Sequence, residues 1–145
     1  NKLDNKQLNQ LYNIADAQIL LTSNEGWGLS LTEAILAGTV IIANVTGGMQ
    51  DQMRFENENG EWVNFNLDFP TNHKGKYTKH GIWAYPVFPS NISIQGSPQT
   101  PYISSDRCSP EDAAAQIMKL YCTDIETRKQ NGYRLFGKYY QSLWD

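Results

Sequence analysis

Apolar residues in the first third of the chain recur at spacings that alternate between those of helices and those of strands. A repeat of three to four residues predicts a helix over residues 5–15, formed by Leu8, Leu11, Tyr12 and Ala15. Two short, mainly apolar runs, at 17–22 and 40–43, are typical of short buried strands. Between them, residues 29–37 predict a second helix, which the glycine at position 38 ends. Such alternation with short connections favours an α/β fold with a parallel sheet covered by helices.

The middle of the chain is less regular. Residues 49–55 predict a short helix and residues 61–65 a short strand. No periodicity is visible from 66 to 109, and all six prolines lie between Pro70 and Pro110. Because proline interrupts both helices and central strands, this segment predicts an irregular insertion. Four aromatic residues of this segment form either a local core or a binding platform: Trp83, Tyr85, Phe88 and Tyr102.

Two closing helices are expected over 110–145. Ser109 and Pro110 supply a capping hydroxyl and a proline at the first helical position, and two acids follow. A helix is predicted over 110–122, with a buried face of Ala114, Ile117, Met118 and Tyr121. A last helix is predicted over about 125–141, with Tyr133, Phe136, Tyr139 and Tyr140 on its apolar side.

Composition narrows the class of protein. The chain has 145 residues, enough for one domain or part of one, and a formal net charge of −3. The chain has no run of basic residues of the kind that indicates binding to nucleic acid. No apolar run approaches the ~20 residues of a membrane span, and no secretory signal is visible. Cys108 and Cys122 are expected to be reduced thiols of a cytoplasmic protein, with a single bridge as the alternative. His73 and His80 lack the spacing of metal ligands, so no metal site is expected.

The candidate site lies between the first predicted strand and the second predicted helix. Glu25 and Glu33 are eight positions apart, across a glycine-containing loop and the first turns of the helix. The amides and positive end of such a junction suit a phosphate, and carboxylates accept hydrogen bonds from sugar hydroxyls. A ligand that carries both groups is a nucleotide sugar. Two alternatives remain: Ser30 and Glu33 match a capping box, and a loop acid such as Glu25 is often only solvated.

This segment resembles the donor-binding motif of retaining GT-B glycosyltransferases of group 1. The motif has two glutamates separated by seven residues, then an alanine-rich helix, a Gly-Thr step and an apolar strand, here Glu25 to Ala43. The resemblance extends over 8–52, is loose over 110–145, and does not explain 66–109. It implies that residues 1–145 are a partial C-terminal donor-binding domain of Rossmann-like fold, with a long irregular insertion. An N-terminal acceptor-binding domain is then missing.

The resemblance also implies roles for individual residues. Glu25 would contact the hydroxyls of the transferred sugar and is the expected catalytic residue, and Glu33 would bind the ribose. The amides around the start of the helix would face the diphosphate, and glycines would let the backbone approach it. Trp27 would either stack on the sugar or cover the loop. The full set of expected donor-binding residues is Glu25, Gly26, Trp27, Gly28, Leu29, Ser30, Glu33, Thr46, Gly47 and Gly48.

The implied activity is transfer of a sugar from a nucleotide diphosphate to an acceptor hydroxyl with retention of configuration, without a metal or other cofactor. The family's basic pair has no counterpart here, because the only bases before Glu25 are Lys2 and Lys6. The isolated fragment is therefore expected to be inactive and, with open sheet edges, to self-associate. The alternative function is a non-catalytic module that binds nucleotide sugars or carbohydrate, or serves in assembly. The donor base, the sugar and the acceptor stay undetermined.

Overall fold

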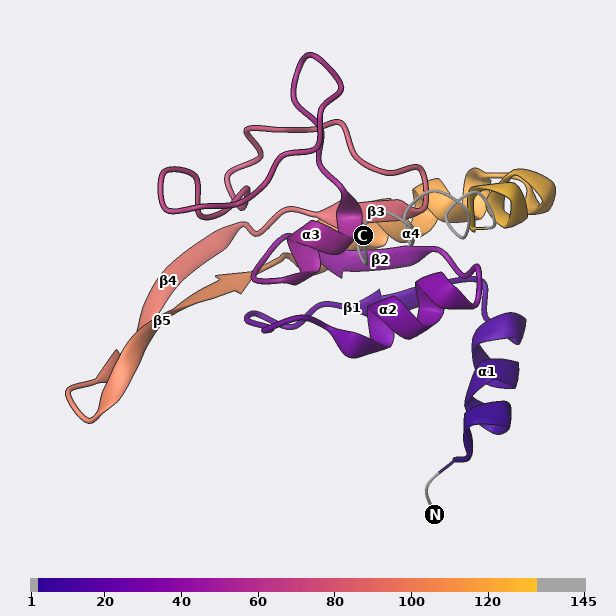
Figure 1. Ribbon diagram of the computed structural model, residues 1–145, viewed down its shortest axis with the longest axis horizontal. Coiled ribbons are helices and arrows are strands. Elements are labelled where there is room, and N and C mark those ends of the chain that lie inside the picture. The colour runs from indigo at the N-terminus through magenta and orange to yellow at the C-terminus, as the bar shows by residue number, and fades with distance from the viewer. Residues whose placement is uncertain (1–2, 133–145) are drawn as a thin grey trace.

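A three-stranded parallel sheet organises the computed structural model, which describes residues 3–132 (Figure 1). The first half of the chain forms α1 (Asn5–Ile14), β1 (Gln18–Leu20), α2 (Leu29–Leu36), β2 (Ile41–Asn44) and α3 (Met49–Met53). The second half forms β3 (Ala84–Val87), β4 (Asn91–Ser97), β5 (Thr100–Arg107) and α4 (Pro110–Cys122). The predicted α/β class and the parallel sheet are confirmed.

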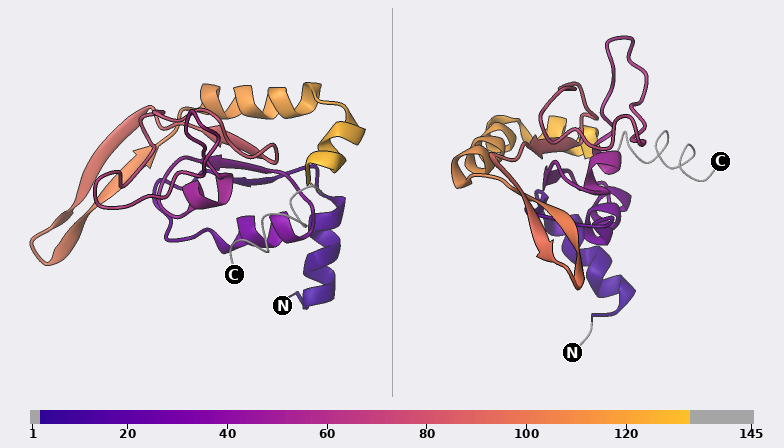
Figure 2. Two further views of the ribbon diagram at one scale, coloured as in Figure 1. Left: turned by 45° about the horizontal axis from the view of Figure 1, so that its top comes forward. Right: turned by 90° about the vertical axis from the view of Figure 1, so that its left-hand side faces the viewer.

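The strands lie in the order β1-β2-β3, so each new strand is added beside the previous one. β2 is central and all four of its residues are buried, because helices cover both faces of the sheet. Figure 2 shows α4 on one face and α2 with α3 on the other, in agreement with the contacts between these elements. The carboxyl ends of β1 and β2 therefore meet at one edge, which also carries the loop before α2.

α2 forms where the sequence predicts it. Leu31, Ala34 and Ile35 share one face and are buried against the sheet. The amide of Thr39 donates to Ala34 and that of Gly38 to Ile35, which is the Schellman arrangement at a helix end. The expectation that this helix ends at Gly38 is confirmed.

The prediction that residues 66–109 form an irregular insertion is wrong for three segments, which are β-strands. β3 pairs in parallel with β2 despite Pro86, and β4 and β5 form an antiparallel hairpin that extends away from the sheet (Figure 1). β3 is an edge strand. The carbonyls of residues 83 and 87 accept hydrogen bonds from the amides of residues 41 and 45 at the two ends of β2, so by alternation the nitrogen of Pro86 faces away from the ladder. The missing donor therefore breaks no hydrogen bond.

The strand predicted over 61–65 is also wrong, because this segment contributes only an isolated bridge between Glu56 and Trp62. The four aromatic residues do not form one cluster. Trp83 and Tyr85 are buried in the core, whereas Tyr102 lies exposed on β5. A single binding platform made of all four is therefore excluded.

α4 begins as predicted, since Ser109 accepts a hydrogen bond from the amide of Asp112 and Pro110 occupies the first turn. Its predicted buried face is wrong. Ala113 and Leu120 face the sheet, whereas Tyr121 is 74% exposed and Ile117, Met118 and Ala114 are also exposed. The helix carries apolar residues on two sides, and its contacts with β2 and β3 bury only one of them. The last predicted helix begins at 125, and its residues after 132 lie outside the described part of the chain.

β1 is less buried than predicted. It is the other edge strand, and Ile19 remains exposed because α4 contacts β2 and β3. α1 has the predicted bounds within one residue but contains no buried residue. Self-association through such an edge stays a prediction. Cys108 and Cys122 are both free thiols.

Among residues 3–132, no helix has the length and apolar character required to cross a lipid bilayer.

Truncation of one buried side chain on the central strand tests the core. Ile42 is 1% exposed, so Ile42→Ala should lower the free energy of unfolding by about 2–5 kcal/mol through lost burial and a cavity. Ile94→Ala, on the hairpin and 75% exposed, is the matched control and should change it by about 0.5 kcal/mol or less. Urea denaturation measures both variants, and equal effects would contradict the assigned core.

Candidate functional site

A cavity of about 500 Å³ lies at the edge of the sheet where β1 and β2 end. In open parallel sheets, ligands bind at this carboxyl edge. The loops after β1 and β2 contribute Asn24, Thr46, Gly47 and Gly48, and α3 contributes Gln50 and Asp51. The remaining wall comes from residues of the long segment before β3 and from β5: Phe65, Pro70, Thr71, His73, Ser104 and Asp106.

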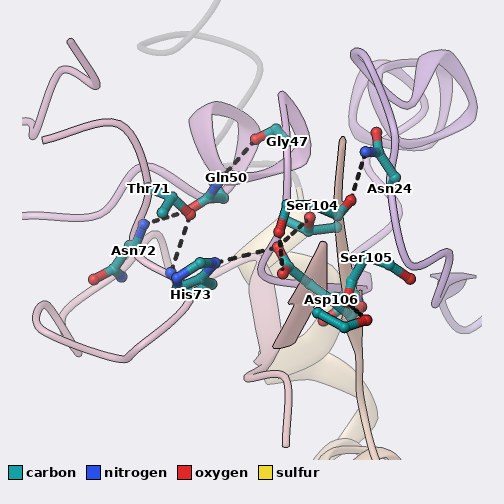
Figure 3. Close-up of polar contacts among 12 residues, drawn as sticks. Asn24, Gly47, Gln50, Thr71, Asn72, His73, Ser104, Ser105 and Asp106 are labelled. Carbon is teal, nitrogen blue, oxygen red and sulfur yellow. Dashed lines mark hydrogen bonds and ion pairs between the residues drawn. The ribbon is translucent and has the colours of Figure 1, made fainter. Parts of the chain in front are cut away.

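Asp106 on β5 is the buried carboxylate of this site, with 2% of its surface exposed. Its Oδ2 accepts hydrogen bonds from the hydroxyl of Thr46 at 2.7 Å and from Nδ1 of His73 at 3.3 Å. Its Oδ1 accepts one from the hydroxyl of Ser104 at 2.6 Å (Figure 3). A buried carboxylate is tolerated only with such donors, so Asp106 holds the ends of β2 and β5 and residue 73 together.

The backbone at the base of the hairpin is joined to the end of the sheet. The amide of Asp106 donates to Ser23 at 2.8 Å, and the side chain of Asn24 donates to the carbonyl of Ser104 at 2.8 Å. The buried side chain of Asn44 donates to the carbonyls of Thr22 and Asp106. The hairpin therefore closes one side of the cavity across the ends of β1 and β2.

Residues 71–73 are fixed by a buried glutamine. Oε1 of Gln50 accepts hydrogen bonds from the amide of Asn72 at 2.6 Å and from the hydroxyl of Thr71 at 3.2 Å. Its amide nitrogen donates to the carbonyl of Gly47 at 3.1 Å (Figure 3). The position of His73 is therefore linked to the glycine loop through one side chain.

The loop of residues 24–28 and the Gly47-Gly48 loop are in direct backbone contact. The amide of Gly48 donates to the carbonyl of Glu25 at 3.2 Å. A Cβ at Gly47 would lie 2.0 Å from the carbonyl oxygen of Glu25, and one at Gly48 would lie 2.1 Å from that of Gly26. The glycine pair is therefore more than a turn, because only glycine allows the two loops to pack this closely.

The loop itself is shaped for the start of α2. Gly28 is the N-cap in the left-handed conformation, with φ of 78°, and no side chain caps this helix. Leu29 is exposed and Ser30 is half-buried in the first turn. Gly26 has open space around it, since nothing lies within 4 Å of a Cβ built there. Room therefore exists for a ligand beside Gly26.

The two glutamates lie in different surroundings, and neither lines the cavity. Glu25 is half-buried and accepts a hydrogen bond of 3.4 Å from the amide of Trp27. Glu33 is also half-buried, and its Oε2 accepts a hydrogen bond of 2.8 Å from the hydroxyl of Tyr12 on α1. The capping box is wrong, because Gly28 rather than Ser30 is the N-cap.

The Tyr12–Glu33 pair persists at neutral pH. Partial burial, then the hydrogen bond and the negative charge of Glu33, raise the pKa of Tyr12 to about 12. The ordinary value is 10.0, so the stability gained from the proton on Tyr12 is complete below pH 10 and is lost between pH 10 and about 12.

Trp27 belongs to a polar network rather than to the cavity wall. Its indole nitrogen donates to the hydroxyl of Thr32 at 2.8 Å, and that hydroxyl donates to Gln52 at 2.9 Å. The side-chain amide of Gln52 donates back to the carbonyl of Trp27. This network favours the loop-cover alternative for Trp27, while stacking on a sugar stays a prediction.

The cavity has few charges. No Lys or Arg is among its described lining residues, whose ionisable members are Asp51, His73 and Asp106. Burial raises the pKa of Asp51. In the described part of the chain, no three His, Cys, Asp or Glu side chains are grouped to hold a metal ion.

A smaller cavity of about 250 Å³ lies at the opposite edge, where β2 begins, and Arg128 there pairs with Asp16 at 3.0 Å. Because ligands of parallel sheets bind at the carboxyl edge, we assign the site to the larger cavity.

Thr46, Gly47 and Gly48 were expected at the site from the sequence, and these three line the cavity. The roles of Gln50, His73 and Asp106 were not predicted. Asp106 and His73 are 33 positions apart, and no local pattern links them. The only available indication was that both lie in a long segment without periodicity, which is often functional when ordered.

The contact between the two loops can be tested with a pair of glycine substitutions. Gly47→Ala should lower the free energy of unfolding by about 2–4 kcal/mol, because the new Cβ clashes with Glu25 and strains a residue with φ of 50°. Gly26→Ala, which meets no neighbour, is the control and should change it by about 0.5 kcal/mol or less. Urea denaturation provides the comparison, and a tolerated Gly47→Ala would refute the contact.

Comparison with known proteins concerns the part of this site that the first half of the chain forms. Residues 1–69 match the family model described as glycosyl transferases group 1. No curated protein and no solved structure matches the chain. The matched segment includes β1, the loop before α2, β2 and the Gly47-Gly48 loop, and it ends before most of the residues on the far wall of the cavity. Residues 1–69 are therefore similar to the group 1 glycosyltransferase family, and the comparison does not extend to the rest of the chain.

Proposed function

We propose that this domain binds a nucleotide-diphosphate sugar at the carboxyl edge of its sheet and takes part in transfer of the sugar to an acceptor hydroxyl with retention of configuration. The family match supports glycosyl transfer in general. The observation that carries the finer proposal is the packing of the loop before α2 on Gly47-Gly48, beside a cavity of about 500 Å³.

In the proposed complex, the diphosphate lies against the amino end of α2. No side chain caps this end, so its amides and partial positive charge are suited to an anion. Gly26 leaves space for close approach. Glu25, in the same loop, would contact hydroxyls of the transferred sugar. Glu33 would accept hydrogen bonds from the ribose with the carboxylate oxygen that Tyr12 does not use.

No metal is needed in this proposal, because the helix end and hydrogen-bond donors stabilise the departing diphosphate. The absence of Lys and Arg among the described lining residues of the cavity keeps one alternative open, a module that binds the donor without turnover. Binding of nucleotide sugars without transfer or hydrolysis, measured with an acceptor-binding domain present, would support that alternative.

Glu33→Ala tests the ribose contact. Loss of a hydrogen bond to a charged group should weaken binding of the nucleotide sugar by about 1–3 kcal/mol in calorimetry. UDP-, GDP- and ADP-sugars are first screened by thermal shift to find the donor, and the bound one is used.

Tyr12→Phe is the matched control, because it removes the partner of Glu33 but keeps the carboxylate. Its affinity should stay within about twofold of the wild type, with stability lower by about 1 kcal/mol. If both variants lose stability and neither loses affinity, Glu33 only holds α1, and its ribose role is rejected.

A further inference from the structure

The proposed contacts to phosphate and ribose do not involve the pair formed by His73 and Asp106. Nδ1 of His73 lies 3.3 Å from Oδ2 of Asp106, and the His73 side chain is 15% exposed, at the wall of the cavity. A carboxylate only accepts hydrogen bonds, so the contact requires the proton on Nδ1. The other ring nitrogen, Nε2, is then an acceptor in the neutral imidazole.

The ring is held in place before any ligand binds. Thr46 and Ser104 donate to the same carboxylate, so Asp106 cannot turn away. The backbone of residue 73 is fixed as well, because its amide donates to the hydroxyl of Thr71, which in turn donates to the buried Gln50. No further hydrogen bond or ion pair of the His73 side chain is found among the described residues. A ligand in the cavity would therefore contact Nε2 of His73, which is held in one position and accepts a hydrogen bond.

The cavity suits a neutral polyhydroxylated group better than a diphosphate. Its described lining residues include no Lys or Arg, and two of them, Asp51 and Asp106, are acids. Amides and hydroxyls line it beside Phe65 and Pro70. Hydrogen-bonding groups next to an apolar surface match a sugar ring, which presents hydroxyls at its rim and C–H groups on its faces.

We infer that the cavity is the subsite for the transferred sugar, in which Nε2 of His73 accepts a hydrogen bond from a sugar hydroxyl and Asp106 is the positioning residue for the ring. This inference rests on the nucleotide-sugar function proposed above. It adds residues of the segment that follows the matched residues 1–69 to the recognition of the sugar, since His73 and Asp106 both lie there.

The test compares each nucleotide sugar with its own nucleoside diphosphate: UDP-glucose with UDP, GDP-mannose with GDP, and ADP-glucose with ADP. His73→Asn keeps an N–H donor for Asp106 but removes Nε2. It should weaken binding of the nucleotide sugar about five- to tenfold and that of the nucleoside diphosphate less than about twofold. His80→Asn is the matched control, because His80 is the other histidine and does not line the cavity. It should change neither affinity by more than about twofold.

The outcomes separate the two proposals. If wild-type protein binds neither class of ligand, the proposed function and this inference both fail. If it binds both and His73→Asn weakens both equally, or neither, the nucleotide-binding function stands and the sugar subsite is rejected.

A second measurement keeps the inference testable if His73→Asn does not fold. Nitrogen NMR of the wild-type protein should show His73 protonated at Nδ1, and its Nε2 resonance should shift on addition of the nucleotide sugar but not of the nucleoside diphosphate. A proton on Nε2 alone, or equal shifts with both ligands, would overturn the assignment.

Discussion

The carboxylate of Asp106 connects three segments that are distant in sequence, namely the end of β2, the loop that carries His73, and β5. Removing an ionised group from water costs several kcal/mol unless hydrogen-bond donors replace the solvent. Thr46, Ser104 and His73 supply those donors, and each is useful only when its segment is in place. The wall of the cavity is therefore fixed by a requirement of solvation, not by apolar packing alone.

The opposite wall depends on a different constraint, the absence of side chains. Gly47 and Gly48 approach the carbonyls of Glu25 and Gly26 more closely than a Cβ would permit. This contact fixes the loop before α2 against the loop after β2, so the amino end of α2 and the glycine loop keep one relative position. Preorganisation of this kind matters for a phosphate site, because donors that are already oriented lose little entropy when the ligand binds.

The elements that could be predicted from the sequence are those whose cause is local. α1, α2 and β2 follow from apolar spacing, and the start of α4 follows from Ser109 and Pro110. The buried face of α4 could not be predicted, because both sides of that helix carry apolar residues and only the sheet selects one. β3 was missed because Pro86 disfavours a central strand, whereas at an edge its nitrogen has no partner to lose.

The residues of the candidate site also divide into those that could be predicted from the sequence and those that could not. Gly47, Gly48 and Thr46 were predicted because they lie in the segment whose spacing resembles a known motif. His73 and Asp106 were not, because their contact joins positions 33 residues apart and exists only after β2, β5 and the loop at 71–73 have assembled.

This division has a functional consequence under the proposals made here. The segment matched by the family would hold the nucleotide and diphosphate and contact the sugar through Glu25, while the segment beyond residue 69 would contact the sugar through His73. These two parts meet at Asp106, which bonds Thr46 from the first and His73 from the second. Substitutions in the later segment could then change sugar specificity without altering the diphosphate site, provided that Asp106 keeps its bond to Thr46. The carboxylate of Asp106, which stabilises the fold, thus limits which substitutions in the wall of the cavity leave the loop that binds the diphosphate in place.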